Sequence, residues 1–308
     1  MAGHRHESVN TVAMRVGIAL PQYVIDVEPG IEVWPAMLSI ARRADALGLD
    51  SVWLSDHPFV EVPHAAPSGA LEPFVAAASL LRATERVHVG TLVASASMRA
   101  PGLIGHQFAS VDAAGSGRAI AGMGAGWYEP EHRAFGVPLR SFAARAVALE
   151  ETLDALEAGG GPAVSVLVGG TGRRMLDLAA RRADMWNVAW DVGPETFAGL
   201  NSRLDDACAA AGRDPATLRR TVGLNVAVGR TDRAIDAAIE RLQARAAFLS
   251  SIDRPALQRH IVIGTPDRCA AALAAYARCD QVIVALLMRD DVEMLELFAS
   301  EVVPPLRS

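Results

Sequence analysis

Short apolar runs rich in β-branched residues alternate with longer amphipathic segments from Met14 almost to the end of the chain. This alternation predicts parallel β-strands connected by α-helices. Eight strand-helix units in 308 residues fit an α/β fold of the closed (β/α)8 TIM barrel type better than an open doubly wound sheet. The predicted strands are Met14–Leu20, Ser51–His57, Val87–Val93, Arg118–Met123, Val164–Val168, Asp184–Ala189, Thr221–Val228 and Gln281–Leu287.

No linker, repeat or low-complexity tract interrupts this pattern, so we expect one barrel domain over residues 14–304. Residues 1–13 and 305–308 are expected to be N-terminal and C-terminal tails. In such a barrel the residues at the carboxyl ends of the strands face the active site, whereas those at the strand starts mainly stabilise the fold. The search for chemistry therefore concentrates on the strand ends.

Composition narrows the class of protein. The formal charge of -6 and the pI near 5.8 argue against a nucleic-acid partner, because such binding needs clustered positive charge. All 29 basic residues are arginine, which excludes Schiff-base, pyridoxal phosphate and Walker-A chemistry, since each needs a lysine.

The three cysteines show no CxxC spacing and fit a reducing compartment as packing residues. No apolar run resembles a signal peptide or a membrane span, so we expect a soluble cytoplasmic protein.

Asp56 and His57 end the second predicted strand. A histidine at the mouth of a barrel can exchange a proton near neutral pH, and a neighbouring aspartate can hold its tautomer. The alternative is a loop histidine capped by a neighbour, and we weigh the two about equally.

The fourth predicted strand runs into GMGAGWYEPE, residues 122–131. Its glycines resemble a dinucleotide fingerprint, but Trp127 stands at the sixth position and Pro130 interrupts any helix, so a Rossmann site is excluded. A bare turn remains, with room for a flat ligand between Trp127 and Tyr128. Glu129 and Glu131 are expected to be solvated.

The fifth predicted strand ends on the glycine-rich turn Gly169, Gly170, Thr171 and Gly172, followed by an amphipathic helix. A backbone without side chains admits a ligand closely, and the free amides that open a helix bind anions. A tight structural turn is the alternative. Phosphate sites recur on the late strands of barrels, and Arg173 or Arg174 offers a further charged contact.

Other chemistry finds little support in the chain. The histidines include no HExxH motif and no cysteine at ligand spacing, so no metal site is expected. Ser95 and Ser97 lack the flanking glycines of a nucleophile elbow. Covalent catalysis is therefore not indicated.

Four longer motifs occur in order: GLDSVWLSDHPF, TERVHVGTLVASASMRAP, GRAIAGMGAGWYEPEHRAFG and VLVGGTGRRMLDLAARRADMWN. Together they resemble the luciferase-like flavin-dependent oxidoreductases, and among these the members that use the deazaflavin coenzyme F-420 (F420). The resemblance covers Val16 to Leu287 and implies the same TIM barrel. One departure from the family is that the usual insert before the fifth strand is shortened.

The resemblance also assigns residues. Asp56 and His57 are similar to the catalytic pair beside the reactive ring of the cofactor. Leu92 and Val93 correspond to the family's non-proline cis peptide at the cofactor. The backbone along the ring or phosphate corresponds to Gly124, Ala125 and Gly126. The phosphate turn corresponds to Gly169, Gly170, Thr171 and Gly172.

The resemblance implies an oxidoreductase that transfers hydride to or from a small organic substrate with coenzyme F-420. Deazaflavin-dependent sugar and alcohol dehydrogenases carry an aromatic residue shortly after the Asp–His pair, where this chain has Glu61. They also carry an acid just after the glycines that follow the fourth strand, where this chain has Trp127. A sugar dehydrogenase is therefore not expected.

The first alternative is a two-component monooxygenase that receives reduced FMN from a partner flavin reductase. The second alternative is a non-catalytic flavin-binding protein. Relatives commonly form dimers, so a homodimer is also an expectation of the resemblance.

Overall fold

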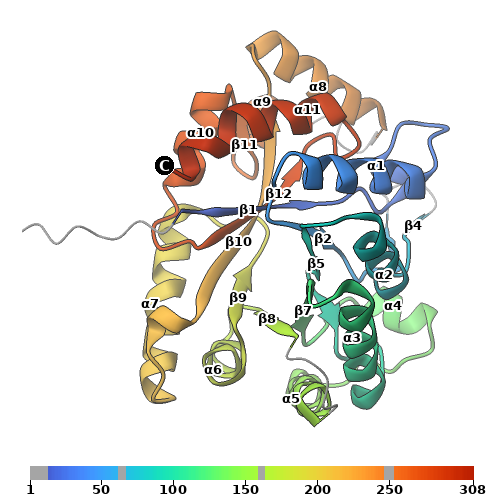
Figure 1. The fold of residues 1–308 in the computed structure, drawn as a ribbon, viewed down its shortest axis with the longest axis vertical. Helices are drawn as coiled ribbons and strands as arrows, with labels where there is room; N and C mark the ends of the chain where they lie inside the picture. The colour runs from blue at the N-terminus through green and yellow to red at the C-terminus, as the bar shows by residue number, and fades with distance from the viewer. Residues whose placement is uncertain (1–12, 62–66, 159–163, 246–252) are drawn as a thin grey trace, which may run out of the picture.

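The computed structural model describes residues 13–61, 67–158, 164–245 and 253–308. Parallel strands close into a barrel, because β9 pairs with β10 and β12 pairs with β1. Figure 1 shows the helices as a layer around these strands. The predicted TIM barrel is therefore confirmed. Its strands are β1 Arg15–Ala19, β2 Ser51–Leu54, β5 His88–Thr91, β7 Ala119–Gly124, β8 Ser165–Gly169, β9 Met185–Val188, β10 Arg219–Val228 and β12 Gln281–Leu286.

Four shorter strands lie outside the predicted set. β6 (Ala94–Ser95) pairs with β7, and β11 (Val262–Gly264) pairs with β10. β3 (Phe59–Val60) and β4 (Ser68–Gly69) form an antiparallel pair beyond β2. Only β6 bears on the site, because it carries the chain away from the end of β5 and along β7.

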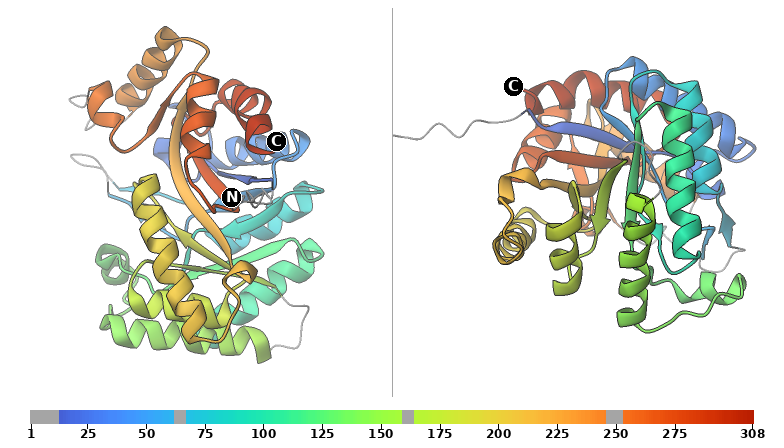
Figure 2. Two further views of the ribbon diagram at one scale, coloured as in Figure 1. Left: turned by 90° about the vertical axis from the view of Figure 1, so that its left-hand side faces the viewer. Right: turned by 60° about the horizontal axis from the view of Figure 1, so that its bottom comes forward.

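Helices connect the strands and cover the outside of the barrel (Figures 1 and 2). Their apolar stripes face the strands, as α6 illustrates with its buried Met175, Leu176 and Ala179. The helices are α1 Val33–Ala46, α2 Pro73–Ala83, α3 Pro101–Gly115, α4 Glu129–Ala134, α5 Phe142–Ala158, α6 Arg173–Arg182, α7 Pro194–Ala210, α8 Asp232–Arg245, α9 Arg254–Leu257, α10 Pro266–Ala274, α11 Val292–Leu297 and α12 Val303–Leu306. In the described ranges, no helix combines the length and apolarity that crossing a bilayer requires.

The two ends of the predicted domain have different outcomes. Of the expected N-terminal tail, residues 1–12 lie outside the described residues. The expected C-terminal tail at 305–308 is wrong in part, because Leu306 ends α12, is buried, and accepts a hydrogen bond from the Met14 amide at 3.1 Å. Arg307 also pairs with Asp50 at 2.6 Å. Burial of an apolar side chain and an ion pair tie this segment to the start of the barrel.

The shortened insert is confirmed, since α5 ends at Ala158 and β8 begins at Ser165. The cysteines are free and buried, as expected for packing residues. Burial raises the pKa of the Cys269 thiol to about 11 and that of Cys279 to about 12. Both thiols therefore stay protonated at neutral pH.

The inside of the barrel has its own small core, separate from the large core between strands and helices. Trp53 of β2 fills much of it and donates from Nε1 to Ser51 Oγ at 2.7 Å. A Cβ at Gly90 of β5 would come within 2.4 Å of the Trp53 ring, so that strand must pass without a side chain there. Leu92 and Val93 pack above this core, and it forms the base on which the site is built. Its buried members are Trp53, Ile120, Leu167, Met185 and Ile283.

Strand packing gives a direct test of the fold. A Cβ added at Gly122 would lie 1.8 Å from the Thr91 carbonyl oxygen of β5, so Gly122→Ala must force β5 and β7 apart. We expect this change to lower the free energy of unfolding by about 3 kcal/mol, measured by urea denaturation. Gly102→Ala in α3 is the control, because its Cβ meets open space. It should change the stability by less than about 0.5 kcal/mol. Equal effects of the two changes would contradict this packing.

Candidate active site

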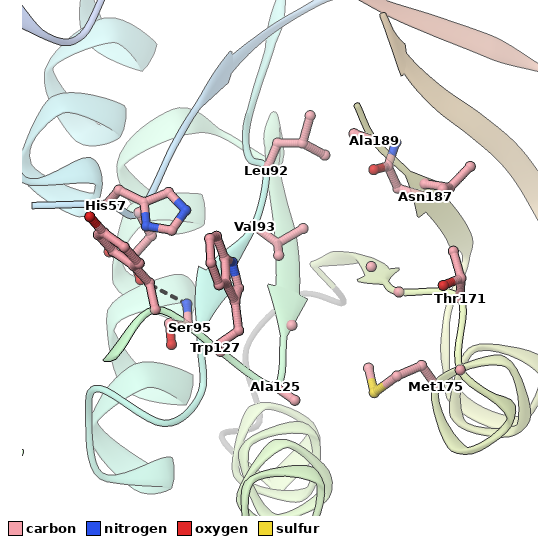
Figure 3. A pocket seen from close by; sticks show the side chains of 18 of the residues that line it. His57, Leu92, Val93, Ser95, Ala125, Trp127, Thr171, Met175, Asn187 and Ala189 are labelled. Carbon is pink, nitrogen blue, oxygen red and sulfur yellow. Dashed lines mark hydrogen bonds between the residues drawn. The ribbon is translucent and has the colours of Figure 1, made fainter. Parts of the chain in front are cut away.

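A cavity of about 550 Å3 opens at the carboxyl ends of the barrel strands. Figure 3 shows His57 and Trp127 on one side, Thr171 and Met175 on the other, and Leu92 and Val93 between them. Parallel strands bring their carboxyl ends to one face, which is why residues far apart in sequence meet here. Every site residue predicted from the sequence lines this cavity: Asp56, His57, Leu92, Val93, Gly124, Ala125, Gly126, Gly169, Gly170, Thr171 and Gly172.

Val93 shapes the floor of the cavity. The peptide bond between Leu92 and Val93 is cis, as the family resemblance predicted. A Cβ at Gly124 would lie 2.7 Å from Val93 Cγ2, and one at Gly169 would lie 3.1 Å from Val93 Cγ1. The glycines at the ends of β7 and β8 therefore leave room for the Val93 side chain, which forms the floor of the cavity.

His57 is held by a residue that the sequence analysis placed in solvent. Its Nδ1 lies 2.7 Å from Glu131 Oε1, and Glu131 is 3% exposed. The prediction that Glu131 is solvated is therefore wrong, whereas Glu129 is exposed as predicted. The carboxylate accepts from Nδ1–H, which leaves Nε2 as the ring nitrogen that can exchange a proton with a ligand.

Two aromatic rings enclose the His57 imidazole. Trp127 and Tyr128 meet it edge-on, with ring centroids 5.9 and 5.7 Å away. The Tyr128 hydroxyl donates to Glu61 Oε2 at 2.8 Å, so the acid that replaces the family's aromatic residue holds a tyrosine from another loop. The aromatic surroundings of His57 thus come from the loop after β7.

Asp56 does not orient His57, which corrects the expectation that it holds the histidine tautomer. Both carboxylate oxygens accept from Arg99, at 2.6 Å from Nη1 and 2.8 Å from Nη2. Oδ2 also accepts from the Ser95 amide at 2.7 Å. This buried bidentate pair ties the end of β2 to β6, so Asp56 fixes the loop that carries Leu92 and Val93.

The Asp56–Arg99 pair gives a stability prediction. Asp56→Ala leaves the Arg99 guanidinium paired with the partly exposed Glu72 at 3.1 Å but without its buried partner, and breaking such a buried pair costs about 3 kcal/mol. We expect that loss in urea denaturation. Asp177→Ala removes an exposed partner of Arg173 and should change stability by less than about 0.5 kcal/mol. A loss of similar size in both variants would argue against the role given to Asp56.

The glycine turn after β8 leads into α6, as predicted. Trp186 Nε1 donates to the Gly170 carbonyl at 2.8 Å and holds the turn in place. Gly172 is the N-cap of α6 without a side-chain cap, and a Cβ there would meet open space. In the part of the chain that the structure describes, the amides of residues 172–174 have no hydrogen-bond acceptor. Such amides, with the helix dipole, favour an anion at this edge of the cavity.

The sequence analysis expected Arg173 or Arg174 to contact an anion at this turn, but the structure places both side chains elsewhere. Neither side chain lines the cavity. Arg173 is almost fully exposed and stands 3.8 Å from Asp177, whereas Arg174 lies 3.7 Å from Glu150 of α5. Arg173 thus lies along α6 and Arg174 reaches across to α5, so the backbone amides and the Thr171 hydroxyl are the donors at the turn.

Comparison with protein families agrees with this arrangement. The family model described as "Luciferase-like monooxygenase" matches residues 14–164 and 158–256, which is most of the chain. The chain belongs to the luciferase-like monooxygenase family. The resemblance predicted from the four sequence motifs is therefore confirmed.

Individual relatives of this family member differ in activity. An F420-dependent glucose-6-phosphate dehydrogenase of Kineococcus radiotolerans is 40% identical over 94 residues, 29% of this chain and 26% of that protein. The alkanal monooxygenase alpha chain of the Kryptophanaron alfredi symbiont is 31% identical over 109 residues, 35% of this chain and 29% of that protein. The chain thus matches only about a quarter of the length of these curated relatives.

Solved structures extend the likeness of the fold. An F420-dependent secondary alcohol dehydrogenase in complex with an F420-acetone adduct superposes with a TM-score of 0.77 at 17% identity. The superposition covers 96% of this chain and 100% of that one. This likeness shows a shared barrel, in agreement with the closed sheet described above.

Several residues of the family site escaped the sequence analysis. Ser95, Asn187 and Trp190 line the cavity, and the peptide before Trp190 is also cis. Asn187 donates from Nδ2 to Thr221 Oγ1 at 2.8 Å, inside the barrel. Asn187 stands near the end of a predicted strand, so the rule that found Asp56 would have found it. Ser95 lies beyond β5 on β6, which no pattern in the sequence indicated.

Proposed function

We propose that the protein is an oxidoreductase that binds the deazaflavin coenzyme F-420 at the barrel mouth and transfers hydride to or from a small, neutral organic substrate. The observation that carries this proposal is the pairing of two features across one cavity. A bare helix start at Gly172 favours an anion on one side, and a histidine oriented by Glu131 stands on the other. A cofactor with a flat ring and a phosphate-bearing tail suits both.

The residues present fit such a group. The cavity volume of about 550 Å3 falls within the range of small-molecule sites. Val93 fills the space beside Gly124 and Gly169 and forms an apolar floor, while Phe142, Met175 and Trp190 offer apolar walls. When bound, a deazaflavin supplies hydride transfer, and the protein contributes orientation and proton exchange.

Each part of the cavity then has a role. The amides at residues 172–174 would hold the phosphate, and the backbone of residues 124–126 would face the ring. His57 exchanges a proton through Nε2, and Glu131 holds the opposite ring nitrogen in its protonated form. Trp127 and Tyr128 limit the access of water to that proton.

The lining supports a neutral substrate. Among the described residues that surround the cavity there is no arginine, and the chain has no lysine. The two acids in the lining, Asp56 and Glu131, are already paired with Arg99 and His57. A phosphorylated sugar would therefore lack a side-chain cation, so we do not carry the substrate of the glucose-6-phosphate dehydrogenase over to this chain.

A titration of the purified apoprotein tests the cofactor. Oxidised and reduced coenzyme F-420, and reduced FMN under anaerobic conditions, are added separately and followed by absorbance and fluorescence. Micromolar binding of the deazaflavin alone supports the proposal. Binding of reduced FMN alone would overturn it and favour the monooxygenase alternative. The sequence match to the alkanal monooxygenase alpha chain supports that alternative. Stoichiometric binding of the deazaflavin with no hydride transfer to any carbonyl compound would favour the non-catalytic alternative.

A further inference from the structure

A chain of three hydrogen-bonding side chains leads from the cavity into the protein. Ser95, which lines the cavity, lies 3.0 Å from Ser97 between their Oγ atoms. Ser97 Oγ lies 2.9 Å from Nε2 of His132, and Nδ1 of His132 lies 3.0 Å from the Val137 carbonyl oxygen. His132 is only 2% exposed. We refer to Ser95, Ser97 and His132 as the Ser–Ser–His chain.

The Val137 carbonyl, at the inner end of the chain, fixes the direction of these hydrogen bonds. The Val137 carbonyl only accepts, so Nδ1 of His132 carries a proton. In the neutral imidazole Nε2 then accepts, and Ser97 donates its one proton to it. Ser95 must consequently donate to Ser97, and its oxygen presents only lone pairs to the cavity.

Protonation of His132 reverses every bond except the one to Val137. Nε2 then donates to Ser97, Ser97 donates to Ser95, and the Ser95 hydroxyl proton is free to point into the cavity. One proton on a buried imidazole therefore decides whether the cavity meets a hydrogen-bond acceptor or a donor at Ser95.

The two hydroxyls are held closely in place. A Cβ at Gly126 would lie 2.1 Å from Ser97 Oγ and 2.3 Å from Ser95 Oγ, so the bare backbone of this residue packs against both. Gly126 adopts a φ of +77°, which other residues rarely tolerate. The Ser95 amide is fixed in turn by Asp56 at 2.7 Å. Only a glycine at position 126 leaves room for this arrangement.

Ser97 also borders a second cavity of about 390 Å3, which is lined mainly by the segment after β6, residues 137–140 and α5. Arg140 and Arg145 line that cavity. Ser97 therefore lies at the edge of a second cavity, whereas Ser95 lies at the edge of the main one.

We propose that the Ser–Ser–His chain is a proton relay that acts in the main cavity together with His57, so that loss of either one slows proton transfer. This inference rests on the proposed function, in which a carbonyl substrate receives hydride from the reduced deazaflavin. The carbonyl oxygen then takes the Ser95 hydroxyl proton, Ser95 takes the proton of Ser97, and Ser97 takes the proton from His132 Nε2. The substrate oxygen ends protonated and His132 ends neutral, still carrying its proton on Nδ1. Oxidation of an alcohol runs the same transfers backwards.

Ser95 would touch the substrate, whereas Ser97 and His132 act through it as positioning residues. The test therefore uses Ser97→Ala, which interrupts the chain outside the main cavity, and His132→Gln. Glutamine keeps a hydrogen-bonding group near the Nε2 position but cannot hold the transferable proton. Ser110→Ala is the matched control, because Ser110 is an exposed serine of α3 whose hydroxyl donates to the His106 carbonyl of the same helix.

The first readout needs no cofactor. Nitrogen-15 NMR of the imidazole side chains in the apoprotein should show His132 protonated at Nδ1, and Ser97→Ala should shift only its Nε2 resonance. The second readout is single-turnover reduction of cyclohexanone, a neutral carbonyl probe, by the protein loaded with reduced coenzyme F-420. Ser97→Ala and His132→Gln should both slow this step about 100-fold and change its solvent isotope effect, with the Ser110→Ala rate unaltered.

Two results would overturn the relay: an Nε2-protonated neutral His132, or unchanged rates in both variants. Restored activity in Ser97→Thr, which returns a hydroxyl, would support the relay over a purely structural effect. Failure of the wild-type protein to bind the deazaflavin would refute the proposed function, and the NMR readout would still decide whether the Ser–Ser–His chain has the stated direction.

Discussion

Gly172→Asp should bind coenzyme F-420 about thirtyfold more weakly than Gly172→Asn, because either side chain can cap the same helix amide but they differ in charge. The two side chains have nearly the same shape, and a Cβ at residue 172 meets open space in a φ of -69° that any residue adopts. Only the aspartate adds a negative charge to the amides at the start of α6. Repulsion between that charge and a phosphate a few ångströms away should cost about 2 kcal/mol or more, roughly a thirtyfold weakening.

The same pair of variants separates binding from folding. Both Asp and Asn are good N-cap residues, so thermal unfolding of the apoproteins should occur at the wild-type temperature or slightly above it. Fluorescence titration with the deazaflavin measures the affinities, and raising the salt concentration should narrow the gap between them. Equal affinity of Gly172→Asp and Gly172→Asn would show that no anionic group binds at this turn.

The second large effect is expected at His57. Loss of a general acid or base lowers turnover by about 100- to 10,000-fold, and His57→Ala removes the cavity-lining ring whose Nε2 is left for proton exchange. Glu131→Gln keeps the ring but removes the carboxylate that accepts from Nδ1–H, so we expect a smaller loss of about tenfold from a wrongly oriented ring. Coenzyme affinity should change little in either variant. Single-turnover hydride transfer measures the effect.

His260→Ala provides the matched control for that experiment. His260 is also paired with an acid, Asp191, at 2.9 Å, but both side chains are more than half exposed and lie outside the main cavity. Its removal should leave turnover unchanged. Turnover in His57→Ala equal to that of His260→Ala would remove His57 from proton exchange and leave the Ser–Ser–His chain as the remaining candidate.

The barrel could be predicted because its causes are local. Alternating apolar runs and amphipathic segments need only their neighbours in sequence to choose strand or helix, and the pattern from Met14 to Leu287 contained all barrel strands. The strand-end rule then gathered the lining correctly, from Asp56 to Gly172, because parallel strands deliver their carboxyl ends to one face.

What the sequence could not supply was the pairing of groups across that face. Adjacency in sequence suggested Asp56 as the partner of His57, but in the folded chain Asp56 binds Arg99 and the partner is Glu131, 74 residues from the histidine. A glutamate is usually exposed, and Glu131 is buried here because α4 packs it against His57. Ser97 and His132 likewise reach each other only because β6 runs beside β7.

The sequence by itself thus determined the barrel, its family and the ring of residues around its mouth, since hydrophobic periodicity and backbone freedom are properties of short segments. The tertiary structure alone decided which carboxylate meets which base, and which hydroxyl meets which imidazole. Hydrogen bonds of this kind depend on tenths of an ångström between distant segments, and packing of the complete chain sets those distances.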